Sequence, residues 1–405
     1  MEECLLIHYS EVGLKGGNRG FFEATLQRSI ELALGPLEPG RLERLRGRLV
    51  LGLTADVDRE LLQQKLASVP GVAYFGWALR VPQTIEAIES AALEHMSQPP
   101  AYRTFRVRTR RAAKSFPMSS NEISAAVGAA IQARSGAGVD LQAADATLRI
   151  ELVDREAYVY RRRVEGPRGL PVGTGGRVVA LLSAGIDSPV AAYRMITRGC
   201  RVILVHFHSQ PYTSKASAEN AAELAGLLSR YQGPARLYLV PLAPLQQQIV
   251  ALTPPRLRVL LYRRMMLRIG AAIAEREGAL ALVTGDSLGQ VSSQTLVNLA
   301  AVGAATGIMI LRPLVGVDKQ AITREAEAIG TYPISIQPYS DCCSYLMPRR
   351  PETAASPRDL AAAEALLGHL EPLIQSALEA AELRRIKPVW PGGGWGVPDC
   401  ESDSL

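Results

Sequence analysis

The residues best placed to do chemistry lie in one short stretch, residues 177–188, which read RVVALLSAGIDS. Its apolar part, residues 178–182, predicts a buried parallel strand. Small residues follow as a tight turn, and Pro189 stands where a helix would begin, a position that does not need the N–H that proline lacks. A strand, a small-residue turn and a helix aim unpaired backbone N–H groups at an anion. The stretch therefore predicts a phosphate-binding loop.

The segment SAGIDS indicates which kind of phosphate loop this is. The GxxxxGK[ST] triphosphate loop is absent from the chain. SAGIDS is similar instead to SGGxDS, the pyrophosphate loop of the N-type ATP pyrophosphatases, which split ATP into AMP and pyrophosphate. Ala184 replaces a glycine of that pattern. Because alanine resists a positive φ, we expect this residue to be αR or β, or the loop to be reshaped. A plain strand-to-helix turn is the alternative.

Composition sets further bounds. A chain of 405 residues predicts two to four domains, and a net charge of +6 mildly favours a polyanionic partner. Five cysteines, two of them adjacent and none in a CxxC pattern, argue against a disulfide framework or a zinc ribbon. No apolar run reaches the ~20 residues that span a bilayer. The N-terminus lacks a signal-peptide pattern. We therefore expect a cytoplasmic protein with no membrane partner.

Composition and hydrophobic period divide the chain into five parts. They are a small α/β unit (1–55), a second α/β unit (56–165), a Gly- and Pro-rich linker (166–176), the largest domain (177–350), and a C-terminal helical extension (helix over 357–385) with an irregular tail (351–405). In the largest domain strands alternate with helices, which predicts an α/β fold with a doubly wound parallel sheet. Ligands bind such sheets beyond the carboxyl ends of the strands. Residues 183–188, 206–208, 284–287 and the loop after Leu311 are all expected there.

Basic residues gather in the first two units. A Gly-rich turn after the first strand carries two cations, and a second group lies on an alternating strand in which Phe105 and Val107 oppose Arg106 and Arg108. An arginine-lined strand suits a phosphate backbone. The alternatives are a solvated loop and an edge strand blunted by charge. The candidate nucleic-acid contacts are Lys15, Arg19, Arg106, Arg108, Arg110, Arg111 and Lys114.

Taken together, seven segments resemble the ThiI family of tRNA sulfurtransferases, the 4-thiouridine synthetases. They are EVGLKGGNRGFFE, SAGIDSPVAA, VHFHSQPYTS, RRMMLRI, TGDSLGQVSSQTLVNL, RPLVGVDKQAI and IGTYPISIQPYSDCC. The resemblance implies a ferredoxin-like N-terminal domain, an α/β THUMP domain that binds tRNA, and a PP-loop ATP pyrophosphatase domain. It also implies the reaction: ATP adenylates O4 of uridine 8 in tRNA, and persulfide sulfur, supplied by a cysteine desulfurase, replaces AMP to give 4-thiouridine.

The resemblance also assigns roles to residues. The ATP site would comprise Leu181, Leu182, Ser183, Gly185, Asp187, Ser188, His206, Phe207, Arg263, Gly285 and Gln294. Asp187 is the residue expected nearest to Mg²⁺. Arg264 would meet the phosphates together with Arg263, the alternative being a solvated helix face. Asp286 is a further candidate for metal or ribose.

The sulfur chemistry points to the adjacent thiols of Cys342 and Cys343. The family pattern makes Cys343 the functional cysteine, whereas two buried structural cysteines are the alternative. Longer members carry a C-terminal rhodanese domain with the persulfide cysteine, and residues 351–405 do not resemble one. Three sulfur carriers remain open: Cys343 alone, Cys342 and Cys343 as a pair, or Cys400 in the tail. By analogy with the family, a homodimer is expected.

Two other functions are left open by the sequence. The first is another PP-loop ATP pyrophosphatase that acts on a small molecule, which leaves the basic residues and the cysteine pair unexplained. The second is an RNA-binding protein with a degenerate nucleotide domain, which Ala184 alone supports.

Overall fold

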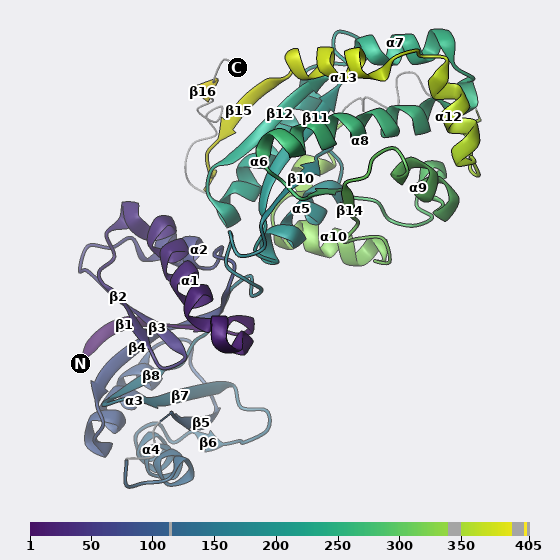
Figure 1. Ribbon diagram of the computed structural model, residues 1–405. Helices are drawn as coiled ribbons and strands as arrows, with labels where there is room; N and C mark the ends of the chain where they lie inside the picture. Colours follow the sequence, from purple (N-terminus) through teal and green to yellow (C-terminus); the bar gives the residue numbers. More distant parts are fainter. Residues whose placement is uncertain (113–115, 339–349, 391–400, 403–405) are drawn as a thin grey trace. The chain divides into compact units, whose positions relative to one another are not determined.

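The computed structural model describes residues 1–112, 116–338, 350–390 and 401–402 (Figure 1). The chain divides into two compact units, Met1–Pro171 and Val172–Leu405, here called unit 1 and unit 2. Lys114, Cys342, Cys343 and Cys400 lie outside the described residues. Within the described ranges, no helix is long and apolar enough to cross a membrane.

Unit 1 is built on a mixed sheet with the strand order β2-β3-β1-β4-β8-β7-β5-β6, and β9 pairs with β4. The strands are β1 (Glu2–Tyr9), β2 (Leu42–Leu45), β3 (Arg48–Gly52), β4 (Val72–Pro82), β5 (Thr104–Arg111), β6 (Gly138–Val139), β7 (Ala146–Val153), β8 (Glu156–Tyr160) and β9 (Val164–Glu165). The α-helices are α1 (Arg19–Leu34), α2 (Arg59–Leu66), α3 (Ile85–Ser97) and α4 (Ser120–Ser135).

The long strand β4 joins the two halves of unit 1. It runs antiparallel to β1, with Leu5 opposite Trp77, and its second half pairs with β8, with Leu79 opposite Val159. In the element order β1-α1-β2-β3-α2-β4, the strand β4 lies beyond the boundary predicted at residue 55 and pairs with β1. The sequence marks where a strand lies, but not which distant strand shares its hydrogen bonds.

Unit 2 is built on a sheet with the order β14-β13-β10-β11-β12-β15-β16. The strands are β10 (Arg177–Leu181), β11 (Arg201–His208), β12 (Ala235–Pro241), β13 (Ala281–Val283), β14 (Met309–Leu311), β15 (Glu382–Ile386) and β16 (Glu401–Ser402). The strands β10 to β14 are parallel to one another, and β15 is antiparallel to β12. The predicted doubly wound parallel sheet is confirmed.

Helices cover both faces of this sheet (Figure 1). They are α5 (Asp187–Thr197), α6 (Ala216–Gln232), α7 (Ala243–Leu252), α8 (Arg258–Glu277), α9 (Leu296–Gly303), α10 (Lys319–Ala328), α11 (Tyr332–Ser335), α12 (Pro357–Ala365) and α13 (Leu370–Glu379). Alternate residues of β10 enter different cores: Val179 packs with α7, α8, α12 and α13, whereas Val178 and Ala180 pack with α5, α6 and α10. This two-sided burial explains why the strand sequence is almost wholly apolar.

The C-terminal region differs from its prediction. A single helix was expected over residues 357–385, but Gly368 with φ +74° separates α12 from α13, and β15 follows. Leu383 and Ile386 of β15 are buried in the unit 2 cores. Pairing with β12 overrides the weak strand propensity of the sequence ELRRI.

Candidate active site

The loop between β10 and α5 closes on two serine hydroxyls. The N–H of Ser183 donates to Oγ of Ser188 at 2.8 Å, and the two hydroxyl oxygens lie 2.9 Å apart. The N–H of Gly185 donates to Oγ of Ser183 at 3.3 Å. Because α5 begins without a side-chain cap, the N–H groups of its first turn can face a bound anion. The strand–turn–helix geometry of a phosphate loop is therefore present.

Ala184 fits this loop without strain. Its side chain is fully buried, and its φ is not positive. Of the two outcomes that the sequence allowed, the structure has the first: the residue stays in a region open to L-amino acids. The alanine is thus no sign of a degenerate loop.

Lys319 adds a cation to the phosphate loop. Its Nζ donates to Oδ1 of Asp187 at 2.6 Å, and each residue begins its own helix, α10 and α5. The side chain of Lys319 remains 44% exposed, so it can also reach a ligand. Lys319 was not among the predicted site residues, although it lies in the segment RPLVGVDKQAI that carried the family resemblance.

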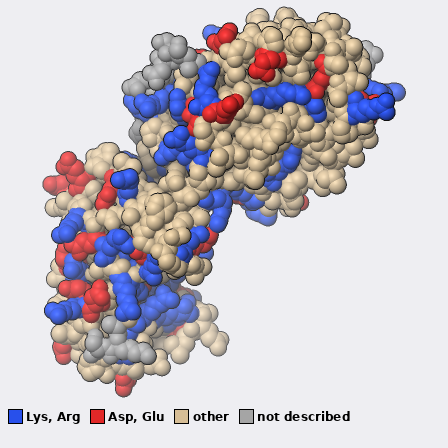
Figure 2. All heavy atoms as spheres, viewed as in Figure 1, with Lys and Arg blue, Asp and Glu red and all other residues tan. Residues whose placement is uncertain are grey.

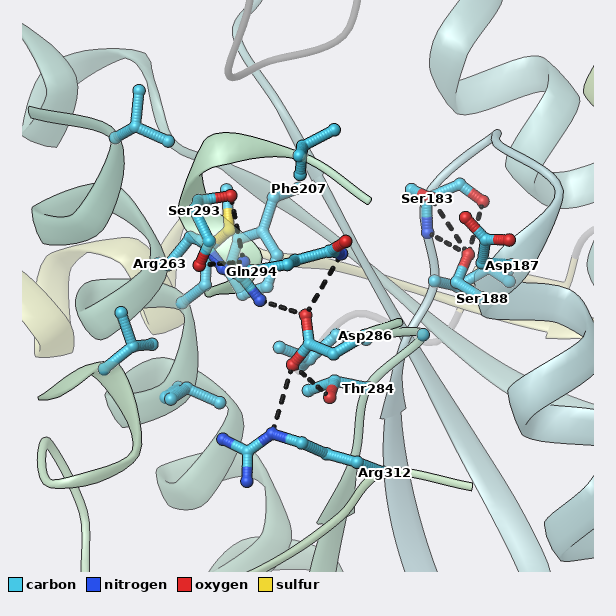
Figure 3. Close-up of a pocket in the computed structure, with 18 of the residues that line it drawn as sticks. Ser183, Asp187, Ser188, Phe207, Arg263, Thr284, Asp286, Ser293, Gln294 and Arg312 are labelled. Atoms are coloured by element: carbon cyan, nitrogen blue, oxygen red, sulfur yellow. Dashed lines mark hydrogen bonds and ion pairs between the residues drawn. The ribbon is translucent and has the colours of Figure 1, made fainter. Parts of the chain in front are cut away.

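A cavity of about 340 Å³ opens beside the loop, at the carboxyl ends of the parallel strands (Figure 3). With the exception of Gly185, every residue predicted for the ATP site lines it: Leu181, Leu182, Ser183, Asp187, Ser188, His206, Phe207, Arg263, Gly285 and Gln294. The carbonyl of Gly185 instead accepts a hydrogen bond from Oγ of Ser335 at 3.2 Å. Arg312 also lines the cavity. It lies in the loop after Leu311 that was expected at this edge, but it was not singled out.

The lining of the cavity has apolar and polar parts. Its apolar residues include Phe207, Val259 and Met266, which suit the flat faces of a base. His206 forms part of the wall: its Nδ1 lies 2.8 Å from the carbonyl oxygen of Leu182, and its Nε2 lies 2.8 Å from Oγ of Ser217. With both ring nitrogens engaged by the protein, His206 shapes the cavity.

The polar residues of the lining include Asp286, which is 3% exposed. Its carboxylate forms an ion pair with Arg263 and accepts hydrogen bonds from Thr284 at 2.7 Å and from Nε of Arg312 at 3.2 Å. Burial raises the pKa of Asp286, but the charge of Arg263, the hydrogen bonds and the charge of Arg312 outweigh it and hold this pKa below its usual value. The carboxylate, a candidate for metal or ribose from the sequence, is therefore ionised at neutral pH, and protein donors contact both of its oxygens.

Arg264 does not line the cavity, contrary to the expectation that it accompanies Arg263. It is buried and donates from Nε and Nη2 to the two carboxylate oxygens of Glu364 at 2.8 and 2.7 Å. Adjacent residues on a helix point in different directions. Arg263 therefore faces the cavity, whereas Arg264 fastens α12 to α8.

Gly285 is a place where the cavity wall tolerates no side chain. A Cβ there would lie 2.7 Å from the backbone nitrogen of Ser188 and 2.8 Å from its Cα. We expect the added Cβ in Gly285→Ala to push the segment after β13 away from the start of α5. ATP binding should weaken about tenfold, because overpacking costs about 1–3 kcal/mol. Calorimetric titration with ATP measures this. Gly307→Ala is the matched control because no atom lies within 4 Å of its Cβ, and equal affinities for both variants would contradict the prediction.

Unit 1 has a separate basic cavity of about 1130 Å³. Arg108 and Arg110 of β5 line it, together with Arg149 and Arg163. Figure 2 shows Lys and Arg side chains gathered on the visible face of this unit. Of the basic residues predicted to contact nucleic acid, Arg108 and Arg110 are exposed in this cavity.

The other predicted basic contacts that the structure describes, which leaves out Lys114, have partners within unit 1. Arg106 donates to Oγ1 of Thr147 at 2.9 Å, and Arg111 donates to the carbonyl of Phe116 at 2.9 Å. Nζ of Lys15 lies 4.9 Å from the ring centroid of Phe22, and Arg19 pairs with Glu23 at 2.7 Å. These contacts fix local structure, and the sequence pattern alone could not separate them from Arg108 and Arg110.

A buried carboxylate ties the two halves of unit 1 together beneath this cavity. Glu151 accepts hydrogen bonds from Arg48 and Tyr160, each at 2.7 Å, and lies 3.2 Å from Nε2 of His8. Burial raises the pKa of Glu151, but the hydrogen bond and charge of His8 and the charge of Arg48 outweigh it and lower the pKa to about 2. β1 and β3 are thereby joined to β7 and β8.

Known protein families and curated relatives match the successive parts of this chain. A ThiI ferredoxin-like profile matches residues 4–76, a THUMP profile matches residues 82–162, and a profile described as thiamine biosynthesis protein (ThiI) matches residues 173–367. The probable tRNA sulfurtransferase of Thermus thermophilus is 43% identical over 97% of this chain and 96% of its own length. That of Moorella thermoacetica is 40% identical over 96% and 99%.

The chain belongs to the ThiI family of tRNA sulfurtransferases. The family resemblance seen in the sequence is thereby confirmed. A solved structure agrees: the crystal structure of a 4-thiouridine synthetase–RNA complex with bound ATP matches with a TM-score of 0.87 and 35% identity, over 96% of this chain and 100% of that chain. The family profiles also locate the change from ferredoxin-like to THUMP sequence between residues 76 and 82, within β4.

Proposed function

We propose that this ThiI-family protein is an ATP-dependent tRNA sulfurtransferase that converts uridine 8 of tRNA into 4-thiouridine. The observation that carries the proposal is the cavity beside the phosphate loop. It combines an apolar wall, an anion-binding helix start and two guanidinium groups in one site. The 4-thiouridine synthetase structure that matches over nearly the whole chain is itself a complex with RNA and ATP, which supports the same ligands here.

In the proposed reaction, O4 of the uracil attacks the α-phosphorus of ATP, and pyrophosphate leaves. The outer sulfur of a cysteine persulfide then attacks C4, and AMP leaves as a good leaving group. A second thiolate, from a neighbouring cysteine or an added thiol, cleaves the S–S bond to the carrier; this releases 4-thiouridine and leaves a disulfide that added thiol reduces. The Ser183–Ser188 pair and the start of α5 would hold the pyrophosphate, and Lys319 would balance its charge. ATP would enter with Mg²⁺, for which Asp187 offers the single carboxylate that Mg²⁺ often takes in addition to phosphate oxygens.

The sulfur would arrive as a persulfide from a cysteine desulfurase. Cys343 remains the proposed acceptor, with Cys342 beside it and Cys400 as the other candidates, because a thiolate is the required nucleophile. The cytoplasm and a homodimer remain part of the proposal by analogy with the family.

The basic cavity of unit 1 is the proposed tRNA contact. We expect the double variant Arg108→Ala/Arg110→Ala to weaken binding of unmodified tRNA about tenfold and to lower the salt slope of log K by about 2, because each arginine neutralises one phosphate. Fluorescence anisotropy at several salt concentrations measures both values. Arg28→Ala/Arg155→Ala removes the same charge from exposed positions outside the cavity. The assignment would be wrong if the two double variants lost affinity equally.

A reconstituted reaction tests the function. It contains unmodified tRNA, ATP, Mg²⁺, cysteine and a cysteine desulfurase, and each component is omitted in turn. We expect sulfur in tRNA only in the complete mixture, with AMP and pyrophosphate formed beside it. Pyrophosphate release that does not depend on tRNA would favour a small-molecule pyrophosphatase. Binding of tRNA without ATP binding would favour an RNA-binding protein.

A further inference from the structure

Asp286 occupies an unusual place in the nucleotide cavity. It lies between two arginines that come from different elements, Arg263 from α8 and Arg312 from the loop after β14 (Figure 3). The side chains of both arginines are mostly buried, 17% and 21% exposed. The single carboxylate of Asp286 therefore holds two arginine side chains that both line the nucleotide cavity.

The contacts on the carboxylate divide evenly between its oxygens. Oδ1 is bound by Arg263 and lies 3.4 Å from Nε2 of Gln294, whereas Oδ2 is bound by Thr284 and Arg312. Each oxygen thus has two donors, and little acceptor capacity remains for a ligand. Asp286 lines the cavity, yet its carboxylate oxygens bind neighbouring protein side chains.

Each arginine also has a second anchor. Nη1 of Arg263 donates to Oγ of Ser293 at 3.1 Å, and Nη2 of Arg312 lies 3.4 Å from the carbonyl oxygen of Leu299. With one negative and two positive side chains, the cluster keeps a net charge of +1 toward the cavity. A long side chain that is already held loses less conformational entropy when it binds a ligand.

We propose that Asp286 is a positioning residue for ATP, which holds Arg263 and Arg312 as an oriented pair so that the anionic nucleotide meets guanidinium groups already in place. This inference rests on the proposed use of the cavity as the ATP site. It assigns a role to Arg312, and it makes the carboxylate act through the arginines and not on the nucleotide. Simple electrostatics would give the opposite expectation, because removing a negative charge should attract ATP more strongly.

A double-mutant cycle separates the two possibilities. ATP affinity of the full chain is measured by calorimetry, without tRNA, for the wild type, Asp286→Asn, Arg263→Gln and the double variant. We expect Asp286→Asn to weaken ATP binding about 10- to 100-fold, the range for a charge-assisted hydrogen bond. Because Asp286 acts through the arginine, we expect its loss to matter several-fold less in the Arg263→Gln background. The same reduction is expected in the Arg312→Gln background.

Thr284→Val provides a milder perturbation should Asp286→Asn fail to fold. It removes only the hydroxyl donor to Oδ2, the oxygen that also binds Arg312, and we expect ATP binding to weaken about threefold, with a smaller effect in the Arg312→Gln background. Unchanged or tighter ATP binding by Asp286→Asn, or effects that simply add in the cycle, would overturn the inference.

The outcome is independent of the sulfur chemistry. Wild-type protein that binds ATP but makes no 4-thiouridine would contradict the proposed function. The double-mutant cycle of ATP affinities would then still test the role of Asp286. If the protein makes 4-thiouridine but the effects on ATP affinity simply add in the double-mutant cycle, only the role given to Asp286 would be contradicted. A wild type that does not bind ATP would overturn both.

Discussion

Lys319→Ala is expected to slow tRNA-dependent pyrophosphate release at least about 100-fold, the usual loss when one group that stabilises developing negative charge is removed. The loop SAGIDS carries no lysine or arginine of its own. Lys319 lies against it, 2.6 Å from Asp187 at the first turn of α5, and so is placed to balance the charge of the departing pyrophosphate. Pyrophosphate release at saturating ATP and tRNA measures the effect.

A matched control lies on the same helix. Arg324→Ala removes one exposed positive charge from α10, five residues further along the chain, and we expect a rate close to that of the wild type. Binding of tRNA should be unchanged in both variants. The role given to Lys319 would be refuted by a rate within threefold of the wild type in Lys319→Ala.

Cys343→Ser is expected to lower 4-thiouridine formation at least about 1,000-fold, because serine at neutral pH cannot supply the nucleophilic sulfur. Release of pyrophosphate should stay within a few-fold of the wild type, since adenylation precedes sulfur transfer in the proposed reaction. Pyrophosphate and 4-thiouridine are counted in one reaction, so their ratio reports how far the two steps are uncoupled.

Two companion variants decide between the sulfur carriers that the sequence left open. Loss of 4-thiouridine in Cys343→Ser alone identifies a single acceptor. Equal loss in Cys342→Ser identifies a pair of thiols, and loss in Cys400→Ser adds the tail. Normal 4-thiouridine formation by Cys343→Ser would contradict the assignment.

The fold was largely predictable where the signal is local. The alternation of apolar strands with helices over residues 177–350 was enough to predict the parallel sheet of unit 2. Pairing between distant strands was not predictable: β4 binds both β1 and β8, and β15 adds to the edge at β12. Those choices depend on tertiary contacts, which periodicity does not record.

The same distinction holds for the site. The phosphate loop is a continuous motif, and the predicted ATP residues other than Gly185 line one cavity. Lys319 and Arg312 were missed because their partners, Asp187 and Asp286, lie 132 and 26 residues away in the sequence. Conversely, nothing in the alternating pattern around Arg106, a candidate nucleic-acid contact, reveals its hydrogen bond to Thr147.

The most direct measurement is the position of sulfur in a tRNA transcript treated with the protein, ATP, Mg²⁺, cysteine and a cysteine desulfurase. Mass spectrometry of nuclease fragments compares a transcript with uridine at position 8 and one with cytidine there. We expect one 4-thiouridine at position 8, with AMP formed in equal amount, and none in the cytidine transcript. Sulfur at another position, or AMP formation without any 4-thiouridine in the complete mixture, would contradict it.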